Sequence, residues 1–141
     1  MIFKKEEKKE KLFFVKICAL LIHAAKIDEN FTKNEEEIIK KTIKELGLED
    51  EKTLKTFEDA KKIEENSNQI LDFTKEVKTL SEEDKAKIIE ALWSIIYSNK
   101  EADIYETNLM RRLAGLLYID SKTMGDIKER VKKKYSNDIC C

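Results

Sequence analysis

The fold is decided by residues 21–48, which read LIHAAKIDENFTKNEEEIIKKTIKELGL. An apolar run leads into the acidic stretch Asp-Glu-Asn at 28–30, and isoleucines then recur at helical spacing. Thr32 and Glu35 have the spacing of a capping box, in which each side chain bonds the backbone amide of the other residue. Gly47 between two leucines is typical of a helix stop. The stretch therefore predicts two helices joined by a short acidic loop.

The same pattern recurs 71 positions later, where residues 92–119 read LWSIIYSNKEADIYETNLMRRLAGLLYI. The shift pairs equivalent positions of the two copies: Leu21 with Leu92, Asp28 with Asn99, Glu35 with Glu106, and Leu46 with Leu117. A single helical pair would leave its apolar face in water. We therefore expect two related halves that pack around a pseudo-twofold axis.

Composition sets the fold class. The chain of 141 residues has no proline and only three glycines, so the usual breaks between strands are absent and long runs of helix formers remain. Hydrophobic residues make up 41% of the chain, which is enough for one core. These features predict an all-α fold, a compact bundle of about seven helices. We expect one domain over residues 1–135 and a short flexible tail over 136–141.

Periodicity and caps place the individual helices. They are expected at residues 7–27, 32–46, 50–65, about 70–77, 82–98, 104–117 and 121–135. The fifth of them has apolar residues around most of its circumference, including Trp93, and is expected to be central. Phe73 and Tyr97 fit the same core by helical spacing.

Charge and targeting signals narrow the function classes. Lys and Arg number 28 and Asp and Glu number 29, so no global field attracts nucleic acid, and any membrane contact is at most peripheral. The apolar run over residues 12–27 imitates an export signal, but Lys16 interrupts it and it is too short to span a bilayer. Cys18, Cys140 and Cys141 do not form a secreted disulfide framework. We expect a cytoplasmic protein.

The two copies of the pattern resemble the TerB-like domains, named for tellurite resistance proteins and similar to the region that precedes the J-domain of a membrane co-chaperone. The resemblance is strongest over residues 22–35 and continues over 92–117. It departs from the family at Glu29, and at Asn99 and Lys100, where the family favours an Asp-Gly pair. The resemblance implies an all-helical fold and a noncatalytic, stress-associated role. The expected function is accordingly an adaptor that binds a protein partner.

A divalent-cation sensor is the alternative that the first loop suggests. Oxygens are offered at alternate positions, as at the start of an EF-hand loop, by Asp28, Asn30, Thr32 and Asn34. Lys33 replaces the glycine of that motif, and Ile39 replaces its bidentate glutamate. A metal site, if present, would use Asp28, Asn30 and Glu35. The other interpretation is that Thr32 and Glu35 only cap a helix, and no further cofactor is expected.

An enzyme is the third class, and it has little specific support. The only histidine, His23, lies one turn before Asp28, and a catalytic pair with Asp28 or Glu35 is conceivable. Phosphate loops, nucleophile elbows and Cys-x-x-Cys pairs are absent from the sequence. We therefore expect no catalytic activity. The candidate binding residues lie in or beside the two loops: His23, Asp28, Glu29, Glu35, Asn99, Glu101, Asp103 and Glu106.

The last predicted helix is locally basic, with Lys128, Arg130 and three consecutive lysines at 132–134. Two interpretations are open. The charges are favourably placed if they lie at a helix C-terminus, where they oppose the macrodipole. They could instead make a weak contact with an acidic protein or an anionic lipid.

Overall fold

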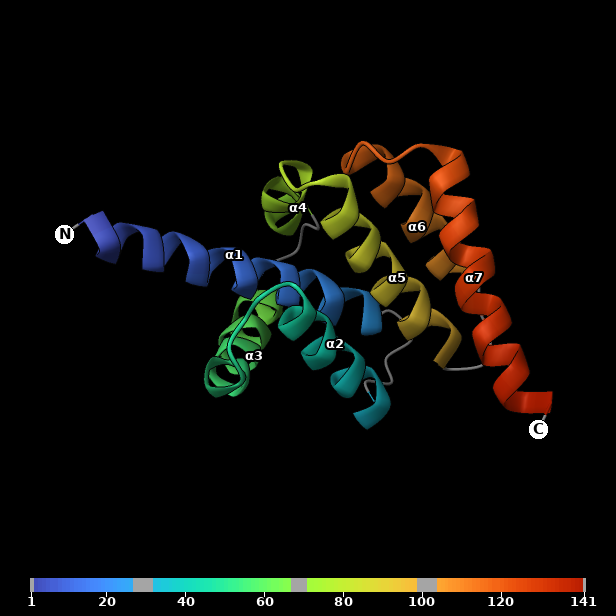
Figure 1. The fold of residues 1–141 in the computed structure, drawn as a ribbon, viewed down its shortest axis with the longest axis horizontal. Coiled ribbons are helices and arrows are strands. Elements are labelled where there is room, and N and C mark those ends of the chain that lie inside the picture. The colour runs from blue at the N-terminus through green and yellow to red at the C-terminus, as the bar shows by residue number, and fades with distance from the viewer. Residues whose placement is uncertain (1, 27–31, 67–70, 99–103, 141) are drawn as a thin grey trace.

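The computed structural model describes the backbone of residues 2–26, 32–66, 71–98 and 104–140, and the side chains of 12–26, 32–66, 73–75, 77–98 and 108–134. Over this part the chain forms seven helices and no strand (Figure 1): α1 (Ile2–Ala25), α2 (Lys33–Glu45), α3 (Asp50–Glu65), α4 (Leu71–Lys78), α5 (Glu82–Ser98), α6 (Ile104–Leu116) and α7 (Ser121–Cys140). The predicted all-α bundle of seven helices is confirmed.

Two helices extend further than the sequence patterns predicted. α1 begins at Ile2 instead of near Glu7, and α7 continues to Cys140 instead of ending near Tyr135. The physical reason is the absence of a helix breaker, because the chain has no proline, no glycine precedes Gly47, and no glycine follows Gly125. No helix in the described part of the chain is long and apolar enough to cross a membrane.

The core is centred on α1 as much as on α5. α1 packs against α2, α3, α4 and α5, and Figure 1 shows it running between the α2–α3 pair and the helices α4 and α5. From Phe14 to Ala25 its side chains are buried except at Lys16 and His23. Residues 14–25 of α1 are therefore covered on nearly all sides. α5 contributes the expected broad apolar surface: Ile88, Ile89, Leu92, Trp93, Ile95 and Ile96 are all buried.

The helix bounds follow the sequence repeat. Adding 71 to the bounds of α2, 33 and 45, gives 104 and 116, which are the bounds of α6. Adding 71 to the start of α3, residue 50, gives 121, the start of α7. In the same order α1 packs on α3, and α5 packs on α7. The pseudo-twofold axis between the halves stays a prediction.

The second helix of each half ends with the same hydrogen bonds. After α2, the amide of Gly47 donates to the carbonyl of Lys44 and the amide of Leu48 to that of Ile43, which is the predicted Schellman stop. After α6, the amide of Tyr118 donates to Gly115 and that of Ile119 to Ala114. Gly47 has φ 117° and Tyr118 has φ 56°, so both corners use the left-handed region.

Candidate functional site

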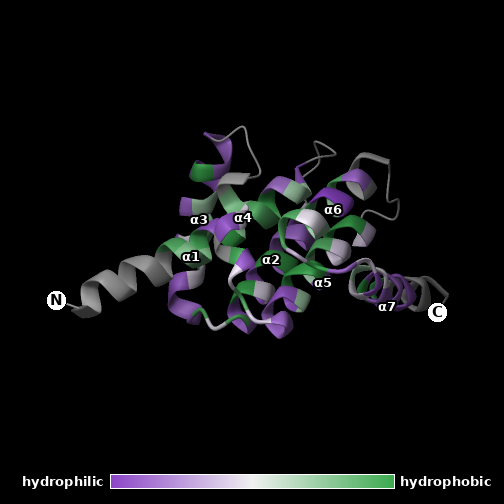
Figure 2. Ribbon diagram, turned by 90° about the horizontal axis from the view of Figure 1, so that it is seen from above, coloured by the Kyte–Doolittle hydropathy of each residue, from purple (hydrophilic) through white to green (hydrophobic). Residues whose placement is uncertain are grey.

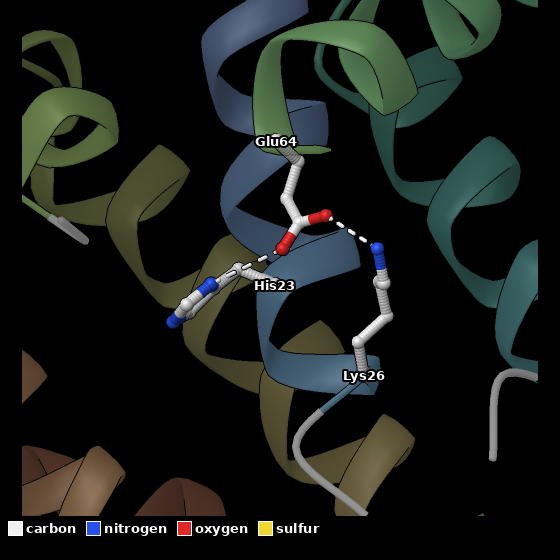
Figure 3. Close-up of polar contacts among 3 residues, drawn as sticks. All are labelled: His23, Lys26 and Glu64. Atoms are coloured by element: carbon white, nitrogen blue, oxygen red, sulfur yellow. Dashed lines mark hydrogen bonds and ion pairs between the residues drawn. The ribbon is translucent and has the colours of Figure 1, made fainter. Parts of the chain in front are cut away.

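Three polar side chains join the end of α1 to the end of α3, as Figure 3 shows. Nδ1 of His23 lies 3.3 Å from Oε1 of Glu64, and the ammonium group of Lys26 donates a hydrogen bond of 2.8 Å to Oε2 of the same carboxylate. We call these residues the Glu64 cluster. Because Lys26 is the last described residue before the loop from Asp28 to Glu35, the cluster fixes the upstream end of that loop.

The Glu64 carboxylate is largely buried and has a polar partner on each oxygen. Its side chain is 9% exposed, and a carboxylate removed from water needs hydrogen bonds to compensate for lost solvation. Lys26 supplies a short charge-assisted bond, and His23 occupies the other oxygen. Lys26 keeps 42% of its side chain in solvent, which screens the ion pair and limits its strength. The cluster therefore holds α1 against α3 with moderate energy and specific geometry.

Glu64 is a site residue that the sequence patterns did not single out, although one signal marks it. Phe57, Ala60 and Glu64 follow each other at helical spacing, and the structure buries all three. An acid in the register of a buried stripe requires a polar partner on the facing helix. Here that partner is the pair of side chains from the last turns of α1.

The downstream end of the loop is the capping box predicted at the start of α2, and the structure confirms it. The amide of Thr32 donates to Oε1 of Glu35 over 2.8 Å, and the amide of Glu35 donates to Oγ1 of Thr32 over 3.2 Å. The Thr32 hydroxyl also donates to the same Oε1 over 3.0 Å. Glu35 is 0% exposed, so its carboxylate caps the helix from inside the fold.

Most of the other predicted site residues lie outside the part that the structure describes. These are Asp28, Glu29, Asn30, Asn99, Glu101 and Asp103. Glu106 is in the first turn of α6, and its side chain is not among those described. Asp103 and Glu106 have the sequence spacing of a second capping box, which stays a prediction. The described flanks of the first loop are the part of the candidate site that has a defined geometry.

The described residues offer no ready cation site. Glu35 is the one predicted ligand whose side chain is described, and its Oε1 already accepts two hydrogen bonds from Thr32. Across the described residues, no group of three or more His, Cys, Asp or Glu side chains is placed to hold a metal ion. The divalent-cation site stays a prediction that depends on Asp28 and Asn30.

The acid–base groups are used in structural contacts. His23 contacts Glu64 instead of Glu35, the partner considered for an enzyme. Cys18 in α1 is fully buried, and desolvation raises the pKa of its thiol to about 12, opposed by the charge of Lys40. Such a thiol stays protonated near neutral pH and is a poor nucleophile. These contacts explain the geometry of the described residues without a chemical step.

Comparison with protein families gives a match over most of the chain. The family model described as tellurite resistance protein TerB matches residues 14–129. This range begins in the buried part of α1, ends within α7, and includes the Glu64 cluster, the capping box and both loops. No curated protein and no solved structure matches the chain. The resemblance inferred from the two copies of the pattern is confirmed over this range.

Proposed function

The chain belongs to the TerB family, and we propose that it is a noncatalytic cytoplasmic adaptor in a stress-associated complex of the tellurite resistance type. Its partner is a protein. The proposed contact surface is the loop from Asp28 to Asn34, which includes Glu29, together with His23 at the neighbouring end of α1. Glu35, which the sequence also suggested for this surface, is buried and caps α2 instead. The net charge of −1 supports a protein partner over nucleic acid.

One observation carries the proposal: the loop is anchored on both sides by specific polar contacts. The Glu64 cluster holds Lys26, two positions before Asp28, and the buried capping box holds the far end of the loop. Fixed ends reduce the entropy that a binding loop loses when it meets its partner. Binding residues are also commonly carried on loops that a rigid scaffold positions. The arrangement therefore favours recognition of a partner over chemistry.

The second loop offers four residues for the same partner: Asn99, Glu101, Asp103 and Glu106. The residues just before the second loop differ from those before the first. The positions equivalent to His23 and Lys26 are Ser94 and Tyr97, which cannot form the same ion pair with an acid on the neighbouring helix. We therefore assign the main contact to the first loop.

The test is an affinity pull-down from the native host with the full chain as bait. Asp28→Asn removes one carboxylate from the proposed surface. Glu83→Gln removes one exposed carboxylate from the first turn of α5 and is the matched control. We expect the same thermal stability in all three proteins, with recovery of the main partner reduced severalfold by Asp28→Asn alone. Equal recovery with both variants would show that the loop is not the contact surface.

Calorimetric titration with calcium, magnesium and zinc separates the adaptor from the cation sensor. The adaptor predicts no binding heat for the purified chain. A saturable heat that disappears in Asp28→Asn and persists in Glu83→Gln would assign the loop to a cation and overturn the proposal. Asp28→Asn replaces a charged carboxylate with a neutral amide, and the charge of the ligands is a main determinant of affinity for these ions.

A further inference from the structure

Residues 130–134 of α7 carry a concentrated run of positive charge. Arg130, Lys132, Lys133 and Lys134 are all exposed, whereas Val131 between them is buried. We call these four residues the α7 basic run. No acid interrupts residues 130–134. Figure 2 shows α7 as a strongly hydrophilic helix at the end of the molecule away from the N-terminus.

The α7 basic run is more concentrated in positive charge than the residues before it, where Asp126 and Glu129 lie four positions before Arg130 and Lys133. Some lysines elsewhere form ion pairs, as Lys40 does with Glu36 at 3.1 Å and Lys44 with Asp50 at 3.4 Å. No ion pair joins any member of the run to another described residue. Like charges this close on a helix destabilise it slightly, so an anion from outside the chain would relieve the repulsion.

The helix macrodipole does not account for the run. Positive side chains are stabilised at a helix C-terminus only within about the last turn. α7 ends at Cys140, and its last turn contains no basic residue. The interpretation that these charges lie at the end of the helix is therefore wrong, because the helix continues well past them.

Helix geometry spreads the charge around the whole solvent side of α7. The stripe of Met124, Ile127 and Val131 is buried and faces the core, and α5 is the helix that α7 packs against. Successive residues are rotated by about 100° around the axis. Arg130 and Lys134 consequently lie on one flank of that stripe, Lys132 lies on the other, and Lys133 points away from the core.

We propose that the α7 basic run binds an acidic segment of a partner protein. An extended acidic segment can cross the helix and reach both flanks, whereas a flat membrane meets one side at a time. Surface helices that lie on membranes also present exposed apolar side chains. The exposed large hydrophobic residues of the described chain are Leu12, Leu54 and Tyr118, and none of them is on α7. None of the residues in the α7 basic run is among those proposed for the loop contact.

The test uses fluorescence anisotropy of a labelled oligoglutamate peptide titrated with the full chain. The triple variant Arg130→Gln, Lys132→Gln and Lys133→Gln removes three charges from the run and keeps good helix formers in place. The control variant Lys41→Gln, Lys55→Gln and Lys62→Gln removes three exposed charges from α2 and α3. We expect the first variant to lose about tenfold in affinity and the control less than about twofold. Affinity of the unaltered chain should fall as salt rises.

Three results would overturn the proposal: no peptide binding by the unaltered chain, equal losses in the two variants, or tighter binding to other polyanions. The last is measured with phosphatidylcholine vesicles that contain phosphatidylserine and with a short DNA duplex at the same salt. Circular dichroism of both variants checks that the helices are intact. Asp28→Asn should bind the peptide normally, so failure of the loop assignment and failure of this proposal give different results.

Discussion

The two halves of the molecule build the same corner with different residues. After α2 the chain turns through Gly47, for which a left-handed backbone has no steric cost. After α6 it turns through Tyr118, which has a Cβ atom and is 72% exposed. The ammonium group of Lys78 lies 5.5 Å from the Tyr118 ring and provides a partial compensation. The comparison teaches that the fold requires the Schellman hydrogen bonds and tolerates a strained residue to obtain them.

The helices that follow these two turns differ in the opposite sense, because the one in the second half has the better N-cap. α3 begins after Glu49, whose side chain makes no capping hydrogen bond. α7 begins after Asp120, the position equivalent to Glu49, and Oδ1 of Asp120 accepts a hydrogen bond of 2.6 Å from the amide of Thr123. The first half therefore has the better helix stop, and the second half has the better helix start.

The two helix–helix interfaces that correspond in the two halves, α1–α3 and α5–α7, also differ in chemistry. The Glu64 cluster joins α1 to α3, whereas the α5–α7 seam contains Trp93, which stacks on Tyr97 at 6.0 Å between ring centroids. Lys128 places its ammonium group 5.3 Å from the centre of the Trp93 ring. One seam depends on a buried carboxylate and the other on a buried aromatic ring. Substitutions that separate these contributions follow, from the largest expected effect to the smallest.

Trp93→Ala tests whether the aromatic ring holds the second seam. Trp93 is 2% exposed, so its removal should lower the free energy of unfolding by about 3–5 kcal/mol in a denaturant melt. Trp93→Phe is the control. It keeps a ring and removes the buried Nε1, which has no hydrogen-bond partner, so it should lose much less. If Trp93→Ala shifts the melting temperature by only about a degree or two, the ring lies outside the core.

Glu35→Ala and Glu106→Ala compare the capping positions of the two halves. Glu35 is buried and bonds both the amide and the hydroxyl of Thr32, so its loss should lower stability by about 2 kcal/mol. Glu106 holds the equivalent position on α6, and its loss should cost about 0.5–1 kcal/mol, the ordinary value of a cap. Paired urea melts measure the difference. Equal losses would mean that the buried position of Glu35 adds nothing to the capping box.

Tyr118→Gly and Gly47→Ala exchange the residue types of the two corners. Gly47→Ala should lower stability by about 1 kcal/mol, because an alanine is strained at φ 117°. Space is not the cause, since the added Cβ would be 4.0 Å from Cζ of Phe14, an ordinary contact. Tyr118→Gly should raise stability by about 0.5 kcal/mol, as relief of strain exceeds the added freedom of the unfolded chain. A loss of stability in Tyr118→Gly would show that the Lys78 contact outweighs the strain.

The pH dependence of stability should show the difference between Asp120 and Glu49. The hydrogen bond from the Thr123 amide lowers the pKa of Asp120 in the folded chain. A lowered folded pKa gives stability that is present above the unfolded pKa of about 3.9 and is lost as pH falls through the folded pKa. Asp120→Asn should lack this acid-dependent loss, whereas Glu49→Gln should retain it. Melts at neutral pH and at about pH 3 measure this loss of stability. A parallel loss in the unaltered chain and in both variants would contradict the assignment.

The features predicted correctly from the sequence are local. The capping box of Thr32 and Glu35 is closed within one turn, and the stop at Gly47 is set by the backbone freedom of one residue. The buried stripe of α5 follows from periodicity alone. The repeat also located the bounds of α6 from those of α2. The cap, the stop and the stripe depend on residues a few positions apart, and the repeat is a comparison of two stretches of the same sequence, so the sequence contains this information directly.

The features that only the tertiary structure decided depend on distant residues. His23 and Glu64 are 41 positions apart, and their contact exists because α3 packs along α1. The same packing, with α2, α4 and α5 added, buries residues 14–25 of α1 on nearly all sides. Tyr118 takes a backbone conformation that its residue type disfavours. The sequence determined where the helices form, because helix formation depends on neighbouring residues. Packing determined the polar contacts between helices and the backbone strain, because those energies arise only when the fold brings the helices together.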